Sequence, residues 1–178
     1  MIKLLMNLCA TKRNAMFYLS QSNDTFIYGT VLAVDDLYVA LYLISPNGVY
    51  DGTLVTEIER IVRVEVGGQY DEKMNILCSG NTLPIWEFSW NDGIVNSMLN
   101  ASLKTRAVVS IELLKSGYND VIGIIQKVSN KQVKLIRIDE YGKEDGEVYF
   151  KINAITQIIY MSEEEQTIHK LWNTRNYH

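Results

Sequence analysis

The residues with the clearest chemical character are four cations on one stretch of chain. The segment 121–138 contains no Asp or Glu. It contains Lys127, Lys131, Lys134 and Arg137. Cationic side chains along a pair of strands can contact phosphates or an acidic protein. The other interpretation is that they form the solvated outer face of an antiparallel sheet. These four residues are the predicted contacts to nucleic acid or to an acidic partner.

A second group consists of aromatic side chains between the two halves of the chain. Trp86, Phe88 and Trp90 alternate with polar residues and share one side of an extended segment. Buried in a connector, they would pack against a sheet. Left exposed, they would form a face for a protein partner or for stacked bases. The sequence leaves burial and exposure both open, and these three residues are the candidate partner face.

The pattern of an enzyme is missing from the sequence. His169 and His178 are the only histidines, and no motif places a nucleophile beside a base or cradles a phosphate. Asp35 and Asp36, with help from Asp51, could hold a cation, but a polar turn explains the pair as well. We therefore expect no catalysis, no metal, no cofactor and no small-molecule substrate.

Composition and charge limit the class of protein. The chain has 178 residues, of which 47% are apolar, and a net charge of −4. This charge argues against strong non-specific binding to nucleic acid, although a local basic face is compatible with it. Cys9 and Cys78 lie in different segments, which fits a reduced cytoplasmic protein. No apolar run is long enough to predict a membrane span.

The elements that must position these residues occur twice. Residues 17–77 align with residues 111–171 at a constant offset of 94, with about 13 identities in 61 pairs and no gap. Shared turns and shared apolar positions predict two copies of one small domain. We expect a first domain over 1–78, an aromatic connector over 79–93 and a second domain over 94–173.

Each copy begins with helical spacing and continues as five short strands with a helix after them. In the second copy, Asn91 or Asp92 is the expected N-cap of the first helix. Asp51-Gly52 and Asp145-Gly146 read as turns before the fourth strands. The fold class expected is mainly β with short helices, as two tandem five-stranded bent barrels that leave no sheet edge open within a copy. The predicted strands cover 17–19, 26–34, 38–44, 53–58 and 61–66, then 108–114, 121–128, 132–138, 147–152 and 155–161.

A helix followed by a five-stranded bent barrel resembles the Sm-like fold. That family carries a glycine in the second strand, an apolar residue and Asp before the turn, and an apolar residue and Asn after it. Here Gly29 is followed by Val34, Asp35, Tyr38 and Val39, so that Val stands in the place of Asn. In the second copy both the Asp and the Asn are replaced. Other five-stranded barrels, such as SH3-like ones, share the strand pattern.

The resemblance also bears on function. The family's second motif, a basic residue and Gly between the fourth and fifth strands, is degenerate at 58–61 and 152–155, where Gly is missing. The degenerate positions are the family's RNA contacts. Sm-like proteins form rings by pairing fourth and fifth strands, which implies a homo-oligomer. We therefore expect a non-enzymatic interaction module that binds itself or a protein partner, with RNA binding through the basic strand pair as the alternative.

Overall fold

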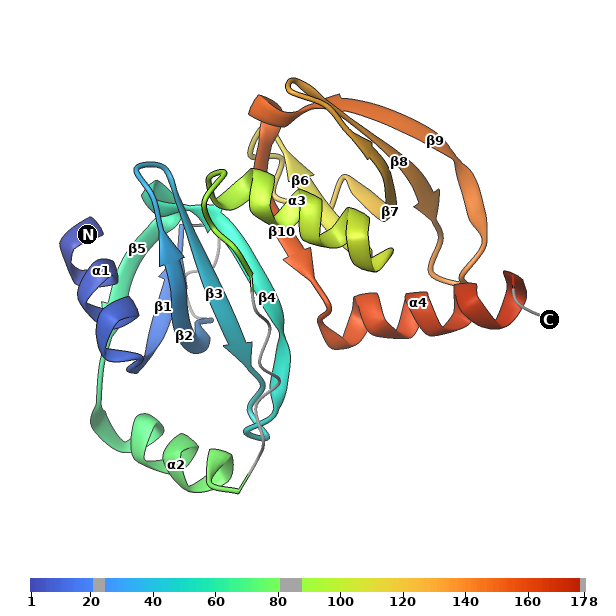
Figure 1. Cartoon of the computed structure of the whole chain (residues 1–178). Helices are drawn as coiled ribbons and strands as arrows, with labels where there is room; N and C mark the ends of the chain where they lie inside the picture. Colours follow the sequence, from blue (N-terminus) through green and yellow to red (C-terminus); the bar gives the residue numbers. More distant parts are fainter. Residues whose placement is uncertain (21–24, 81–87, 177–178) are drawn as a thin grey trace.

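The computed structural model describes residues 1–20, 25–80 and 88–176, and it is mainly β with four helices (Figure 1). The elements of the first half follow the predicted order of a helix, five strands and a helix. They are α1 (Ile2–Thr11), β1 (Asn14–Leu19), β2 (Ile27–Val34), β3 (Tyr38–Ile44), β4 (Tyr50–Glu57), a short 3-10 helix η1 (Ile58–Arg60), β5 (Ile61–Glu65) and α2 (Gly68–Cys78).

The second half repeats this order. β6 begins at Val108, which is 94 residues after Asn14 opens β1, and the same offset relates the starts of β7, β8 and β9 to those of β2, β3 and β4. The elements are α3 (Ile94–Thr105), β6 (Val108–Leu113), β7 (Val121–Val128), β8 (Gln132–Ile138), β9 (Glu144–Lys151), the 3-10 helix η2 (Ile152–Ala154), β10 (Ile155–Tyr160) and α4 (Glu163–Asn176).

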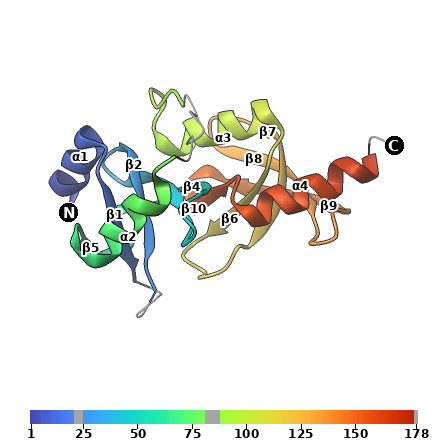
Figure 2. The same ribbon diagram turned by 90° about the horizontal axis from the view of Figure 1, so that it is seen from below.

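The ten strands form one open antiparallel sheet. Their order is β5-β1-β2-β3-β4-β10-β6-β7-β8-β9. The prediction of two closed barrels is not confirmed, because β4 and β5 do not pair with each other within the first half. Instead β4 pairs with β10 of the second half. Sheet edges therefore remain open at β5 and β9, which lie at opposite ends of the molecule in both views (Figures 1 and 2).

Two glycines allow neighbouring strands to approach closely. A Cβ on Gly29 would lie 2.0 Å from the carbonyl oxygen of Tyr42, and a Cβ on Gly123 would lie 2.0 Å from that of Ile136. Side chains of any size would therefore push β2 from β3 and β7 from β8. These contacts explain why glycine stands at the centre of the second strand in each half.

The predicted turns at Asp51-Gly52 and Asp145-Gly146 are wrong. Both dipeptides lie inside strands, where the pair Asp51-Gly52 in β4 faces the single residue Leu43 in β3. An extra residue on one strand is a β-bulge, and the positive φ of Gly52 (88°) suits this conformation. Each glycine is needed for its positive φ, but it marks a bulge within the strand and not a turn before it, so β4 and β9 begin before the glycine.

The apolar core continues from one half into the other. One buried cluster under α1 belongs to the first half and includes Leu5, Phe17 and Leu41. The largest cluster joins Val55 of β4 to Ile158 of β10 and to residues of α3. Within the described ranges, no helix is both long and apolar enough to cross a membrane.

Candidate functional site

The joint between the halves is a strand pair with a defined register. Thr53 faces Tyr160, and Val55 faces Ile158, in antiparallel pairing of β4 with β10. Val55, Ile158 and Tyr160 are each 0% exposed. The joint is therefore continuous in both hydrogen bonds and apolar packing, which is the structure of one folded sheet.

The helix α3 crosses this joint, and an aspartate of the other half holds its start. Asp35 accepts a hydrogen bond from the backbone N–H of Ile94 at 3.1 Å. Its other carboxylate oxygen accepts from the N–H groups of Leu37 and Tyr38 at 2.9 and 2.7 Å, as in a polar turn. The predicted cap from Asn91 or Asp92 is wrong, because the N-cap is Gly93 and makes no side-chain cap.

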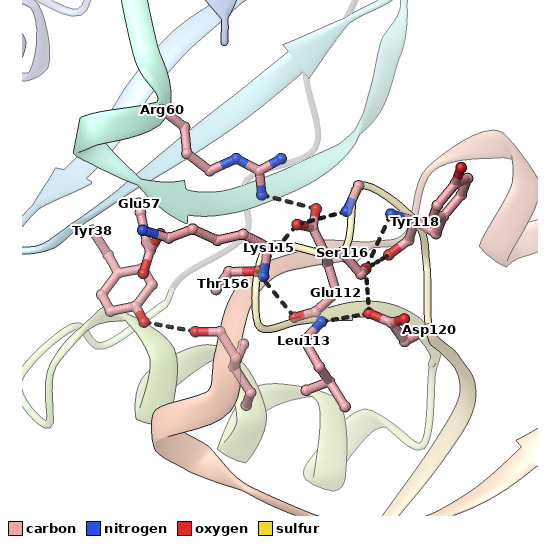
Figure 3. A network of polar contacts seen from close by, with 12 residues as sticks. Tyr38, Glu57, Arg60, Glu112, Leu113, Lys115, Ser116, Tyr118, Asp120 and Thr156 are labelled. Carbon is pink, nitrogen blue, oxygen red and sulfur yellow. Dashed lines mark hydrogen bonds and ion pairs between the residues drawn. The ribbon is translucent and has the colours of Figure 1, made fainter. Parts of the chain in front are cut away.

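A buried ion pair fixes the two halves to one another. Arg60 donates a hydrogen bond from Nη1 to Oε2 of Glu112 at 2.8 Å, and the two side chains are 6% and 2% exposed (Figure 3). The second carboxylate oxygen of Glu112 accepts from Gly117 N–H and from the Thr156 hydroxyl, both at 3.3 Å. Both charged groups are buried, and each would be unfavourable there without its partner. The pair therefore favours the arrangement of the two halves in which Arg60 meets Glu112.

The loop after β6 reaches back to the first half. Lys115 forms an ion pair with Glu57 at 3.3 Å (Figure 3). It forms a second ion pair with Glu59. These acids hold the pKa of Lys115 above its ordinary value by hydrogen bonding. On the other side, the Tyr38 hydroxyl donates to the carbonyl of Ile155 at 2.7 Å. The network is structural, since its charged groups are occupied by each other.

Asp51 also acts across the joint. Its carboxylate accepts a hydrogen bond at 3.1 Å from the backbone N–H of Glu163, in the first turn of α4. Such a bond satisfies an unpaired N–H and places negative charge at the positive end of the helix. Among the described residues, no group of three or more His, Cys, Asp or Glu side chains could hold a metal ion, so Asp35, Asp36 and Asp51 are not brought together as one.

The two open edges differ from their paired counterparts in exposure. On β5, Val62 is 62% exposed, whereas Thr156 at the same place on β10 is 5% exposed. On β9, Tyr149 is 55% exposed, whereas Val55 at the same place on β4 is 0% exposed. Each open edge therefore presents side chains and backbone groups that the joint covers in the other half.

The basic strand pair is placed as predicted on adjacent strands, but half of its charge is neutralised. Lys134 forms an ion pair with Glu147 at 2.7 Å, and Arg137 lies 3.5 Å from the carboxylate of Asp145. Lys127 and Lys131 are exposed and form no ion pair with another described residue. The acids of β9, which the sequence analysis did not place beside these cations, account for the difference.

A groove of about 860 Å³ lies where the second half meets the first. Lys131 and Lys151 line it from one half, and Tyr38 and Glu57 from the other. Apolar side chains such as Leu37 and Ile152 line it together with charges of both signs. It brings Lys131 near Lys151, a further cation of the second half.

The aromatic connector is partly packed. Phe88 lies 5.8 Å from the ring of Tyr160 and 5.0 Å from the ring of Trp90, and both connector residues contact the largest core cluster. These contacts favour burial over a free aromatic face. Trp86 lies outside the described residues, as does His178.

His169 lines a small, mostly apolar cavity of about 270 Å³ beside Tyr160 and Glu165. Burial lowers the pKa of His169, so its ring is neutral at physiological pH. Glu165 is 1% exposed, and its oxygens accept from the Ser110 hydroxyl at 2.5 Å and from the N–H of Ser162 at 3.1 Å. The carboxylate holds α4 to the sheet.

Sequence reasoning missed Arg60 and Glu112. A signal for Glu112 was present, because it is the one ionisable residue in the apolar strand 108–113. A charge within such a strand demands a buried partner. Arg60 gave no comparable sign, since it lies between strands in a segment with exposed Glu59. The chain matches no protein-family model, and no curated protein and no solved structure is detectably similar to it.

Proposed function

We propose that this protein is a non-enzymatic interaction module of the cytoplasm that associates with itself or with a protein partner by adding strands to its open sheet edges. The observation that carries the proposal is the internal joint. One edge of each half is already paired, as β4 with β10, and the corresponding edges β9 and β5 are open. Open edges with free backbone groups are templates for strand addition.

The proposal includes two tandem Sm-like units. The strand order β5-β1-β2-β3-β4 recurs as β10-β6-β7-β8-β9, and a 3-10 helix separates the last two strands in each half. Pairing of a fourth strand with a fifth strand of another unit is the association that the resemblance implies. In this chain the two units are covalently joined, so the same contact is made once within the molecule.

Val62 gives a direct test of this function. Val62→Glu places a charge on β5, and Val49→Glu is the matched control, since Val49 is 48% exposed but lies before β4. We expect tagged wild-type chain, cross-linked and analysed by mass spectrometry, to give cross-links from β5 to another protein or to a second copy. Val62→Glu should remove them and Val49→Glu should not. Wild-type chain with no cross-link at β5 or β9 would overturn the proposal.

RNA is the second candidate partner, and a specific feature favours it. Lys127, Lys131 and Lys151 are exposed cations of the second half that form no ion pair with another described residue. If they contact phosphates, affinity for single-stranded RNA falls steeply with salt, and Lys131→Gln with Lys151→Gln lowers the slope by about two. Lys143→Gln with Lys170→Gln is the control. An unchanged slope in the first variant would exclude this surface.

A further inference from the structure

The two open ends of the molecule carry different surfaces, which can be compared position by position with the internal joint. Across the joint, Ala33, Ala40 and Val55 lie side by side on β2, β3 and β4, and the row continues to Ile158 on β10. The three first-half residues are 8%, 0% and 0% exposed. They share one buried cluster with residues of α3. The end that receives a strand and a helix is thus small, apolar and uncharged.

The corresponding row at the open end of the second half is different in kind. Lys127, Lys134 and Tyr149 pair side by side on β7, β8 and β9, each 94 residues after its counterpart. Lys127 and Tyr149 are exposed, and Lys134 is held by Glu147. Two cations and a bulky phenol stand where the joint has two alanines and a valine. A charged edge strand resists the addition of another strand.

The opposite end of the molecule, formed by α1 and β5, exposes apolar side chains. Leu4 on the outer side of α1 is 41% exposed, whereas its counterpart on α3, Met98, is 0% exposed. Val62 on the neighbouring edge is 62% exposed. Exposed apolar side chains at the positions that the joint buries indicate a contact surface.

Charge decides which partner this end accepts. The first 13 residues carry three cations, Lys3, Lys12 and Arg13, and no acid. Docking α1 on the row of Lys127 and Lys134 would bring cations together and remove them from water, which is unfavourable on both counts. The interactions that reinforce the internal joint are also missing there, since Ala154 and Tyr18 stand where Arg60 and Glu112 would be.

We infer that the end formed by α1 and β5 binds a sheet edge of a different protein, one with a small apolar face and neutral or acidic flanks, and that it does not bind the β9 end of another copy. This inference rests on the proposed function and assigns its direction. The end formed by α1 and β5 binds a partner, and the lysines at the β9 end oppose the addition of another strand. It joins an assembly at the first and terminates it at the second.

A gain-of-function experiment tests this inference. Replacing the row with its counterparts, as Lys127→Ala, Lys134→Ala and Tyr149→Val together, gives the β9 end the surface of the joint. In sedimentation velocity, the wild-type chain is expected to remain a single unassociated species as concentration rises. The triple variant is expected to associate at least about tenfold more tightly. Leu4→Glu in the same chain is expected to abolish that association.

Each other outcome is informative. Wild-type association that is lost in both Leu4→Glu and Tyr149→Glu would mean that β9 accepts β5, which overturns the inference and leaves the proposed function intact. Wild-type association lost only in Leu4→Glu would mean that like ends bind each other, which also overturns it. A folded triple variant that does not associate would overturn it as well. If circular dichroism finds that variant unfolded, Lys127→Gln with Lys134→Gln takes its place, with the same expected direction.

Discussion

Arg60 and Glu112 form an ion pair across the joint at 2.8 Å, with side chains 6% and 2% exposed. Their elements are far apart in the sequence, and neither residue has a charged counterpart at the same place in the other half. The pair is therefore a property of the joint. It connects η1 of the first half to β6 of the second, and its loss should be felt by the whole sheet.

Removing one member of this pair is expected to be costly. Arg60→Met leaves the Glu112 carboxylate buried without its cation, and we expect the free energy of unfolding to fall by about 3–5 kcal/mol. Adding Glu112→Gln keeps an oxygen for Gly117 and Thr156 and removes the charge, so the double variant should recover most of the loss. Chemical denaturation measures both.

Arg63→Met is the control for that experiment. Arg63 pairs with Glu65 at 3.2 Å, but the two side chains are 56% and 45% exposed. The change there should stay below about 1 kcal/mol. Equal losses for Arg60→Met and Arg63→Met would show that the buried pair does not hold the joint.

Comparing Gly52 at the joint with its counterpart Gly146 on β9 separates the effect of backbone strain from the effect of packing. Gly52 and Gly146 have φ of 88° and 78°, so alanine at either position should cost about 1–2 kcal/mol of conformational strain. A Cβ on Gly52 would also lie 2.5 Å from the backbone nitrogen of Ser162, whereas nothing lies within 4 Å of one on Gly146. Gly52→Ala should therefore lower the melting temperature further than Gly146→Ala. The reverse order would contradict the close contact of β4 with the start of α4.

Asp35 is expected to matter more than its neighbour. Asp35→Ala removes the hydrogen bond to Ile94 N–H and the bonds of the turn, and loss of a helix cap typically costs about 0.5–2 kcal/mol. Asp36→Ala is the matched control, because Asp36 is exposed and accepts no hydrogen bond from a described residue of the other half. Thermal unfolding of the two variants compares them. Similar losses would argue against the cap.

Buried tyrosines predict loss of stability in alkali. Burial raises the pKa of Tyr42 to about 12, and burial with a hydrogen bond to Asp71 raises that of Tyr28. An unfolded tyrosine titrates near 10. The folded state thus favours the neutral phenol, and the stability that this gives is complete below about pH 10 and is lost as the pH rises through about 12. Circular dichroism and phenolate absorbance should change together in this range, and Tyr42→Phe should move the transition upward.

The strands that depend on local pattern were predictable. β3, β7 and β8 lie at their predicted bounds, because β-branched and aromatic residues fill them and polar corners separate them. The prediction of a turn at Asp51-Gly52 was wrong, because a glycine with positive φ occurs in a bulge as well as in a turn. The resemblance implies that a fourth strand pairs with a fifth strand of another unit. That β4 and β10 pair within one chain could not be derived, because a strand's neighbour across the sheet depends on contacts between distant segments. For the same reason the acids beside Lys134 and Arg137 were not foreseen.

The central claim is that the halves form one sheet with two open edges. Hydrogen exchange of the backbone amides, resolved by residue, tests it most directly. We predict strong protection of the backbone amides along β4 and β10, because each of these strands has a hydrogen-bonded neighbour on both sides. The outward amides of the edge strands β5 and β9 should exchange much faster. Exchange of β4 and β10 at the rates of β5 and β9 would mean that the halves are separate, and it would contradict the account.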